Sequence, residues 1–484
     1  MRNLTMLTDF YQLTMMQGYF VKNKHNTVTV FDMFYRKNPD RSSFSILAGN
    51  EQLVEYIENL HFNDEDIEYL RTFNIFQEDF LSYLKNFKFT GDIYSFLEGS
   101  VILPYEPIIR VKAPIFECQL IETALLNIIN HQSLIASKAT RVANAAGEAA
   151  VLEFGLRRAQ GTDAGVYGAR AAYIGGCVGT SNVLAGQLFD IPVSGTHAHS
   201  WIMSFDTELE AFVAYGEIYQ ETCILLVDTY NTLKSGVPNA IKTFDILKER
   251  GILPKKIGIR LDSGDMAYLS KNARKMLDDG GYKNAIISAS NDLDETLISA
   301  LKSQGAKIDL YGVGTNLITS KDTPAFGGVY KVSAVEKENG EFEPKIKLSN
   351  NPQKITTPGI KQVVRLYDKK SGKFKADLVT LDEEFITEEK DLKIFAPNAT
   401  WKSMTLKANE FTCKKMLEPM FIKGEFVGEK KSAKEIREYC NKEKETIWEE
   451  SKRLNFPQEL YVDLSKSLYN LKQDMINSIR GENV

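Results

Sequence analysis

Apolar residues change their spacing along the chain, and these changes divide it into regions. In residues 1–118, aromatic-rich alternating runs such as Val28–Tyr35 mix with short helical stretches, which predicts an α/β domain. From Gln119 apolar residues recur at helical spacing, and this predicted helix continues toward Ala146, where Gly147 ends it. Residues 400–484 are rich in Lys and Glu, and their texture predicts a helical C-terminal extension.

Residues 119–324 contain short apolar runs, each followed by a polar, glycine-containing turn and a helical stretch. Seven such units predict a parallel sheet closed as an irregular β/α barrel, because parallel strands need helical crossovers. The runs cover residues 151–155, 175–179, 191–195, 223–228, 256–260, 285–289 and 308–312.

Composition narrows the class of protein. The 484 residues carry a net charge of −5, so no global positive field favours nucleic acid or an anionic membrane. The five cysteines lie far apart, which argues for a reducing compartment, and we expect a cytoplasmic protein. Residues Ala171–Phe189 are uncharged, but their glycines and polar residues favour two buried apolar pieces joined by a polar turn over a membrane span.

Each apolar run is followed by unusual polar residues. The βα loops of a barrel converge on one face, so these residues predict an enzyme site at the barrel mouth. Turn and helix-capping chemistry would explain any one of them, but hardly all seven. They are Arg157-Arg158, Thr180-Ser181-Asn182, Thr196 to His199, Asp228, Arg260 to Gly264, Ser290 to Asp292, and Gly312 to Thr315.

Several of these groups suit an anionic substrate. The glycines of Gly312–Asn316 could let backbone N–H groups face a phosphate. A second anion site is suggested by Arg36-Lys37 and by the basic cluster from Lys345 to Lys361. Arg260 and Asp262 share a face of an extended strand end, where the carboxylate can hold ribose hydroxyls or a metal through water.

The pair His197 and His199 leaves alternatives open. The two side chains face the same way on an extended backbone, which would suit the metal pair of a barrel hydrolase. Such a site needs further histidines on later strands, and the other three histidines all precede the barrel runs. An imidazole acting as nucleophile or general base needs no second histidine. A catalytically silent phosphate-binding protein is a further alternative.

Five motifs together resemble the nicotinate phosphoribosyltransferase family. They are LTDFYQLT at 7–14, EFGLRRAQG at 153–161, GTHAHS at 195–200, IRLDSGD at 259–265 and YGVGTN at 311–316. The resemblance implies a split N-terminal α/β domain completed by part of residues 325–400, an irregular barrel and a C-terminal extension, assembled as a homodimer with shared active sites. It implies a ligase-type enzyme of NAD biosynthesis that makes nicotinate mononucleotide and pyrophosphate from nicotinate and phosphoribosyl pyrophosphate. Mg²⁺ would act with the substrate phosphates and ATP as a co-substrate, with no metal ligand assigned to the protein.

The resemblance also implies roles for individual residues. His199 resembles the histidine that ATP phosphorylates, beside His197, and Tyr11 and Phe154 resemble two aromatics that enclose the pyridine ring, Tyr11 reaching across from the other subunit. Arg157 and Arg260 match arginines near the pyridine carboxylate, and Asp262 an acidic residue near the ribose. Further substrate contacts are expected from Thr196 and Asp228, 5′-phosphate contacts from Gly312, Gly314 and Thr315, and pyrophosphate contacts from Arg36, Lys321 and Lys347.

Ser181 bears on which base is used. A related enzyme that acts on nicotinamide carries an aspartate at this position, where it can accept hydrogen bonds from an amide. An aspartate would repel a carboxylate, whereas a serine hydroxyl can donate to it. The resemblance with Ser181 therefore predicts nicotinate as the substrate.

Overall fold

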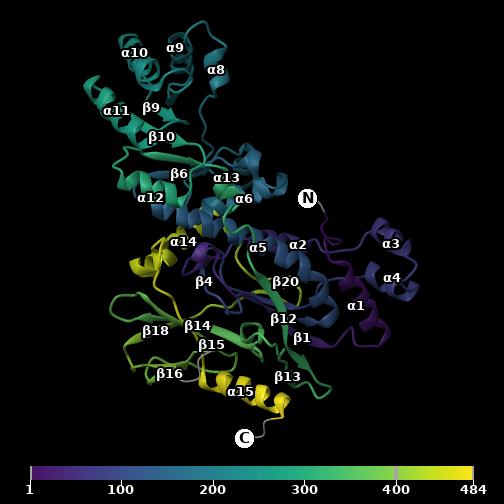
Figure 1. Ribbon diagram of the computed structural model, residues 1–484. Helices are drawn as coiled ribbons and strands as arrows, with labels where there is room; N and C mark the ends of the chain where they lie inside the picture. The colour runs from purple at the N-terminus through teal and green to yellow at the C-terminus, as the bar shows by residue number, and fades with distance from the viewer. Residues whose placement is uncertain (1–2, 397–401, 482–484) are drawn as a thin grey trace. The chain divides into compact units, whose positions relative to one another are not determined.

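The computed structural model describes residues 3–396 and 402–481, which form two compact units. The first unit comprises Met1–Leu134, Ala325–Lys431 and Glu438–Val484, and the second comprises Ile135–Pro324 and Ser432–Arg437. The chain therefore begins in the first unit, builds most of the second, and returns (Figure 1). Helix α5 (Ile115–Ala146) belongs to both.

A seven-stranded sheet is the centre of the first unit. Its order is β13-β12-β1-β5-β3-β19-β20, with β1 (Val28–Tyr35) antiparallel to both β12 (Gly328–Glu336) and β5 (Ile109–Pro114). Strands from after the second unit thus extend the sheet begun by the N-terminal region. The remaining strands are β3 (Asp92–Ser95), β13 (Phe342–Pro344), β19 (Glu418–Ile422) and β20 (Glu425–Phe426), and β2 (Ser45–Ile46) pairs separately with β4 (Val101–Ile102).

Strand β1 shows why the alternating run folds as it does. Phe31, Met33 and Tyr35 point to one face of the sheet, where all three are buried in the core of the unit. On the opposite face Asp32 is also buried, and its carboxylate forms an ion pair of 2.7 Å with Lys361. Both faces of β1 are therefore covered, as expected of a central strand. The helices of this region are α1 (Phe10–Val21), α2 (Asn50–Glu58), α3 (Asp64–Arg71) and α4 (Glu78–Lys85).

Residues 361–481 build a second sheet in the first unit, in the order β17-β16-β21-β15-β14-β18. The segment expected to be a helical extension thus contains strands β17 to β21 as well as two long helices. Many of its Lys and Glu residues are concentrated in α14, whereas the strands carry few, so composition taken over the whole segment suggested helix. The bounds are β14 (Lys361–Asp368), β15 (Phe374–Leu381), β16 (Leu392–Phe395), β17 (Ser403–Leu406), β18 (Phe411–Lys415), β21 (Val462–Leu464), α14 (Ala433–Thr446) and α15 (Lys466–Arg480).

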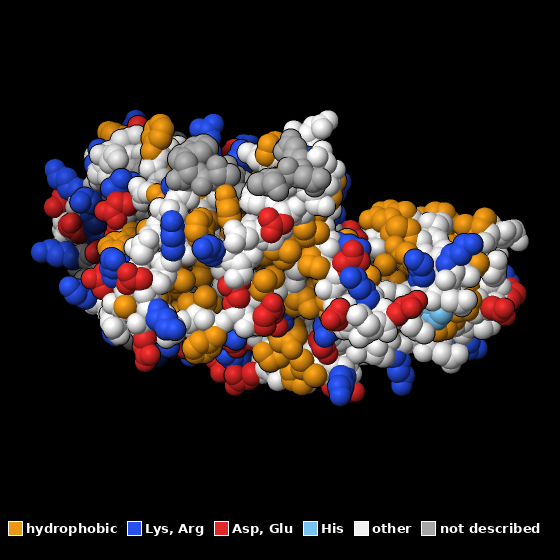
Figure 2. All heavy atoms as spheres, turned by 90° about the horizontal axis from the view of Figure 1, so that it is seen from below, with side chains coloured by type: hydrophobic (Ala, Val, Ile, Leu, Met, Phe, Trp, Pro, Cys, Tyr) orange, Lys and Arg blue, Asp and Glu red, His pale blue; other side chains and the backbone are white. Residues whose placement is uncertain are grey.

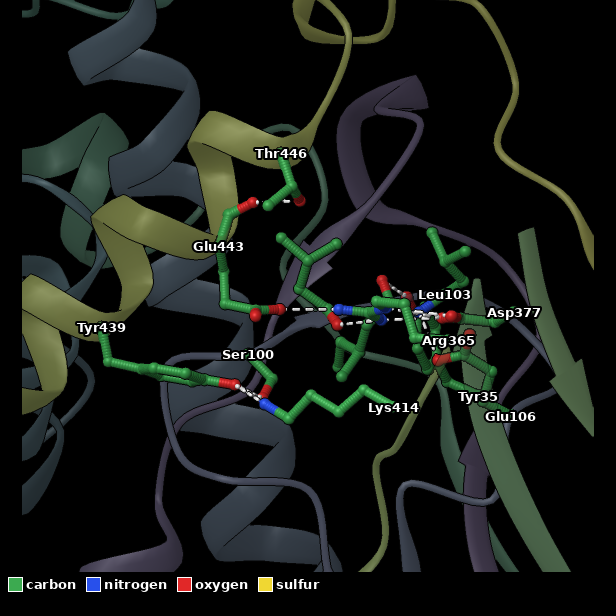
Figure 3. A network of polar contacts seen from close by, with 12 residues as sticks. Tyr35, Ser100, Leu103, Glu106, Arg365, Asp377, Lys414, Tyr439, Glu443 and Thr446 are labelled. Carbon is green, nitrogen blue, oxygen red and sulfur yellow. Dashed lines mark hydrogen bonds and ion pairs between the residues drawn. The ribbon is translucent and has the colours of Figure 1, made fainter. Parts of the chain in front are cut away.

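A buried guanidinium joins distant segments of the first unit (Figure 3). Arg365 on β14 binds Asp377 on β15 and Glu443 on α14, each at 2.7 Å, and it donates to the carbonyl of Val101 at 2.8 Å. Burial alone would lower the pKa of Arg365, but the two carboxylates raise it well above its usual value. Burial and the nearby Asp377 raise the pKa of Glu106, the third carboxyl group of this network, well above its usual value.

The second unit contains six parallel strands in the order β7-β6-β11-β10-β9-β8, which curl into a half-barrel. The predicted α/β fold class is confirmed. Two of the seven runs contribute little to the sheet: residues 175–179 end in a two-residue strand, and 191–195 add only a bridge between Thr180 and Val193. The strands are β6 (Ala150–Glu153), β7 (Gly179–Thr180), β8 (Thr222–Leu226), β9 (Lys256–Leu261), β10 (Ile286–Ser290) and β11 (Leu310–Val313).

Helices alternate with these strands, and α10 and α11 lie against β9 (Figure 1). Because all six strands are parallel, each crossover returns the chain to the end of the sheet where the strands begin. The helices are α6 (Thr162–Gly175), α7 (Val183–Phe189), α8 (His199–Met203), α9 (Glu208–Ile218), α10 (Val237–Glu249), α11 (Met266–Asp279), α12 (Glu295–Ser303) and α13 (Thr315–Ile318).

The uncharged stretch Ala171–Phe189 is divided between α6, β7 and α7. Its first piece is buried as expected, but the expectation for the second was wrong, because α7 exposes Val183, Leu184 and Leu188. Within residues 3–396 and 402–481, no helix is both long and apolar enough to cross a bilayer. Positive and negative side chains are interspersed on the face shown in Figure 2, in keeping with the small net charge.

Replacing Arg365 with Leu should strongly destabilise the first unit, because Asp377 and Glu443 would be left buried without their counter-ion. We expect the free energy of unfolding in urea to fall by about 3–5 kcal/mol. Lys407→Ala, which breaks the exposed pair with Asp391, is the matched control and should leave the unfolding curve unchanged. Equal curves for the two variants would contradict a structural role for the buried network.

Candidate active site

Three polar side chains from different strand ends lie near His199, the first residue of α8. Its Nδ1 lies 3.0 Å from the hydroxyl of Thr229, and its Nε2 lies 4.0 Å from a carboxylate oxygen of Asp262. The other oxygen of Asp262 accepts a hydrogen bond from Ser290 at the end of β10. With Nδ1 donating to Thr229, Nε2 keeps a free lone pair, as a nucleophile requires.

Arg260, on β9, lies beside this group. Its guanidinium donates to the hydroxyl of Thr196 and to the carbonyl of His197, the latter at 3.1 Å. Burial lowers the pKa of Arg260, and the nearby positive charge of Arg157 acts in the same direction. Within the described residues its buried Nε has no hydrogen-bond partner, so this donor is available to an anionic ligand.

Asp228 follows β8 and holds the adjacent strand end in place. One of its oxygens accepts hydrogen bonds from the backbone N–H of Asp262 at 2.9 Å and from the hydroxyl of Ser263 at 2.6 Å. The other oxygen is buried and has no partner in the part of the chain that is described. Carboxylate oxygens suit Mg²⁺, which keeps several waters and takes further ligands from phosphates, so Asp228 and Asp262 fit such an ion.

His197 is buried, and both of its ring nitrogens face the protein backbone. Nε2 accepts the N–H of Leu226 at 3.2 Å, and Nδ1 lies 3.4 Å from the carbonyl of Ala198. Burial lowers the pKa of His197 to about 4. Because the lone pair of Nε2 is already used, His197 is not free to coordinate a metal in this arrangement, which argues against the hydrolase alternative.

Phe154 lies directly after β6, against the glycine loop that follows β11. A side chain on Gly312 would lie 2.5 Å from the Phe154 ring, and one on Gly314 would lie 3.1 Å from the Phe154 carbonyl. Only glycine therefore allows the ring and the loop to lie this close. Thr315 begins α13, a helix of only four residues, and Asn316 ties the loop to the carbonyls of Asp292 and Leu293.

Three predicted residues lie in the first unit. Tyr11 is half exposed on α1, Arg36 follows β1 directly, and Lys347 lies in the loop after β13. Lys331, on β12, had not been singled out in the sequence. Burial lowers the pKa of Lys331, nearby Glu122 raises it, and the charges of Arg36 and Lys347 lower it further. The three cations therefore lie close enough to interact, with one carboxylate near them.

The remaining predicted residues are placed as follows. Arg157 is exposed in the short helical turn Leu156–Arg158, Lys321 is exposed after α13, and the backbone N–H of Ser181 donates to the carbonyl of Glu153 at 3.0 Å. Some strand-end residues instead cap helices, as Asn182 does for α7 and Asp265 for α11. Some of the polar residues predicted to share a site at the strand ends thus contact one another, whereas others cap helices.

Sequence reasoning listed Ser263 and Ser290 among the strand-end residues but gave them no role, and it missed Thr229. In the structure Thr229 contacts His199, Ser263 donates to Asp228 and Ser290 donates to Asp262. A signal for Thr229 was available, because it directly follows the assigned Asp228. Lys331 lies within an ordinary alternating strand, which gave no signal.

The fold and these groups define an enzyme: a parallel half-barrel whose strand ends carry an arginine, two aspartates, a histidine and a glycine loop. The chain belongs to the nicotinate phosphoribosyltransferase family. Residues 6–130 match the nicotinate phosphoribosyltransferase N-terminal domain, residues 149–379 the family itself and residues 360–472 the C-terminal domain.

Individual relatives match over nearly the whole chain. A nicotinate phosphoribosyltransferase of Bacillus subtilis is 45% identical over 479 residues, which cover 99% of this chain and 96% of the relative. One of Dictyostelium discoideum is 36% identical over 521 residues, covering 96% and 87%. The crystal structure of human nicotinic acid phosphoribosyltransferase aligns with a TM-score of 0.85 at 27% identity, covering 97% of this chain and 99% of that chain.

The burial of neutral His197 predicts a pH-dependent contribution to stability. Its pKa of about 4 in the folded state lies below its pKa in the unfolded state. At pH values between these two, the unfolded state binds a proton that the folded state does not. The contribution is complete above about pH 6.5 and is lost as the pH falls toward 4, by about 3 kcal/mol in total. The free energies of unfolding in urea of wild type and His197→Gln should therefore differ less at acid pH than at neutral pH. A difference that does not change with pH would contradict this assignment.

Proposed function

We propose that this protein forms nicotinate mononucleotide and pyrophosphate from nicotinate and phosphoribosyl pyrophosphate, in a reaction coupled to ATP hydrolysis through a phosphohistidine. This would be the first step of NAD salvage from nicotinate. The observation that carries the proposal is the group of His199, Arg260 and Asp262 at the strand ends of a chain related over nearly its full length to this family. His199 lies 4.0 Å from Asp262, whose charge also acts on Arg260.

Nicotinate would be held through its ring and its carboxylate. Phe154 offers a flat face beside the glycine loop, and Arg157 and Arg260 supply positive charge near it. Ser181 places a neutral hydroxyl-bearing residue beside the same strand end, and a carboxylate meets no repulsion there. This combination favours the acid over its amide. Thr196 and His197 support the site through Arg260, which they hold in place.

In the reaction, the bond between ribose C1 and the pyrophosphate oxygen breaks and its electron pair leaves with pyrophosphate. The lone pair of the pyridine nitrogen forms the new bond to C1, so no general base is required. We assign Asp262 to the ribose, and holding both reactants in line can supply about 7–11 kcal/mol of the rate enhancement. Mg²⁺, when bound with the phosphates, neutralises charge that builds up on the leaving pyrophosphate.

The phosphates would be bound by two sets of groups. The backbone of Gly312, Gly314 and Thr315 suits the 5′-phosphate, since no side chain obstructs the two glycines. We assign the pyrophosphate to Arg36 and Lys347, together with Lys331, because these three cations influence one another. Lys321 remains a candidate for the same role.

ATP would phosphorylate His199. Its Nε2 attacks the γ-phosphorus, the N–P bond forms, the bond to the bridging oxygen breaks, and ADP leaves with the electron pair. Thr229 fixes the ring through Nδ1, and Asp262 faces the reacting nitrogen. Hydrolysis of this phosphohistidine would then drive tighter substrate binding or pyrophosphate release.

We also propose a homodimer with shared active sites in the cytoplasm. Tyr11 leaves half of its surface exposed on α1 next to exposed Phe10, as expected of an aromatic side chain offered to a partner subunit. No disulfide joins any two of the five cysteines, all of which lie within the described residues, and this fits a reducing compartment. No nucleic acid or membrane partner is proposed.

The proposed activity is tested with the purified full chain, nicotinate, phosphoribosyl pyrophosphate and Mg²⁺, with and without ATP. Nicotinate mononucleotide should form, faster with ATP, and its formation should stop on removal of Mg²⁺ by a chelator. Nicotinamide in place of nicotinate should react more slowly, because its amide cannot use the arginines as a carboxylate does. Absence of product from both bases would overturn the proposal, and faster use of nicotinamide would refute the role of Ser181.

The phosphohistidine is tested with ATP labelled at the γ-phosphate. Wild type should retain acid-labile label, and His199→Ala should retain none, because the nucleophilic nitrogen is gone. His61→Ala, which changes an exposed histidine of the first unit, is the control and should label as wild type does. Equal labelling of His199→Ala and wild type would move the assignment to another residue.

A further inference from the structure

The carboxyl group of Glu153 is buried at the end of β6, beside the candidate nicotinate contacts but without a role in the reaction described above. Its side chain has no solvent exposure. One oxygen accepts the hydroxyl proton of Thr180 at 2.6 Å, and the other accepts the backbone N–H of Gly155. The backbone carbonyl of the same residue accepts the N–H of Ser181 at 3.0 Å.

These hydrogen bonds connect the two segments that would recognise nicotinate. Phe154 stands between Glu153 and Gly155, so the side-chain bond to Gly155 closes a tight turn around it. Ser181 directly follows Thr180, so the bond to the Thr180 hydroxyl fixes the residue before it. One carboxylate thus sets where the ring-stacking residue and the carboxylate-facing residue stand relative to each other.

The surroundings restrict both segments from their other sides. The N–H of Phe154 donates to the carbonyl of Val313 at 2.8 Å, and its ring fills the space over Gly312. The Thr180 hydroxyl also accepts the N–H of Asn182 at 3.0 Å, and Asn182 caps α7. A shift at Glu153 therefore cannot be absorbed by solvent or by a mobile loop, and it must be passed on to Phe154 and Ser181.

The charge of Glu153 is part of this arrangement. Burial raises its pKa, while the donors of Thr180 and Gly155 act against that rise because they stabilise the ionised form. Both neighbours are donors toward the carboxylate. A glutamine of the same size has one acceptor oxygen and an NH₂ group, so one of the two donors would face a donor.

We propose that Glu153 is the positioning residue for nicotinate recognition: through Thr180 and Gly155 it sets the geometry of Phe154 and Ser181 and so determines affinity for the pyridine carboxylate. The inference rests on the proposed function. It gives a role in specificity to a buried carboxylate whose side-chain hydrogen bonds go to Thr180 and Gly155.

The test compares Glu153→Gln, Thr180→Val and the conservative control Thr180→Ser. Loss of a buried hydrogen bond to a charged group should raise the KM for nicotinate about 10- to 100-fold in Glu153→Gln and in Thr180→Val. The KM for phosphoribosyl pyrophosphate should stay within about twofold, because the side-chain hydrogen bonds of Glu153 go to Thr180 and Gly155 and not to the phosphate loop. Thr180→Ser keeps the hydroxyl and should restore the wild-type KM for nicotinate.

A double variant separates positioning from general damage. If Glu153 and Thr180 act through their shared hydrogen bond, Glu153→Gln/Thr180→Val should be no worse than the more severe single variant. An equal rise in both KM values, or an unchanged KM for nicotinate in both single variants, would overturn the inference. Circular dichroism of each full-length variant checks that it is folded, and Thr180→Val remains informative if Glu153→Gln does not fold.

Calorimetric titration with nicotinate keeps this test distinct from that of the proposed function. If wild type yields no mononucleotide, the proposed activity fails, but the variants can still be compared by their Kd for nicotinate. A Kd raised at least tenfold in Glu153→Gln and restored in Thr180→Ser supports the inference. A Kd equal to that of wild type, or no binding of nicotinate to wild type, overturns it.

Discussion

The burial of the Arg365 guanidinium is the interaction on which the first unit depends. A charge with no solvent exposure is tolerated only where several oxygens surround it, and here they come from β15, α14 and the strand β4. Strand β4 is also held by Tyr35, whose hydroxyl donates to the carbonyl of Ile102. Arg36 directly follows Tyr35 at the end of β1, so the buried charge of Arg365 and the candidate pyrophosphate cluster are connected through strands β4 and β1.

The second unit obeys a different constraint, that of parallel strands. Their carboxyl ends lie at one edge, so His199, Asp228, Asp262 and Ser290 meet although the chain places up to about 90 residues between them. Strand ends are short of backbone partners, and side chains supply them: Asp228 binds a backbone N–H of the next strand end, and Glu153 binds that of Gly155. Structural hydrogen bonding and substrate recognition therefore use the same few carboxylates.

The sequence predicts those parts of the structure that depend on residues close together in the chain, and it fails where the interacting residues are far apart in the chain. The barrel strands and the residues at their ends follow from local pattern, because each run is apolar and each turn polar. The partners of Arg365 could not be predicted, since Asp377, Glu443 and the Val101 carbonyl are brought together only by the tertiary fold. The strands between 403 and 426 were missed because they carry few of the Lys and Glu residues of the C-terminal segment, many of which lie in α14. Lys331 can be recognised as a candidate only in the folded structure, where its charge interacts with those of Arg36 and Lys347.

The order of segments along the chain has a consequence for synthesis on the ribosome. Strand β1 is made early, but its neighbour β12 is made only after the whole half-barrel, some 300 residues later. Until then β1 is paired on one side only, with β5, and its other edge is an open template of backbone N–H and C=O groups. The half-barrel can complete its sheet while the first unit still lacks the segments Ala325–Lys431 and Glu438–Val484. A nascent chain that stalls before Gly328 would therefore carry a finished catalytic half beside an aggregation-prone edge.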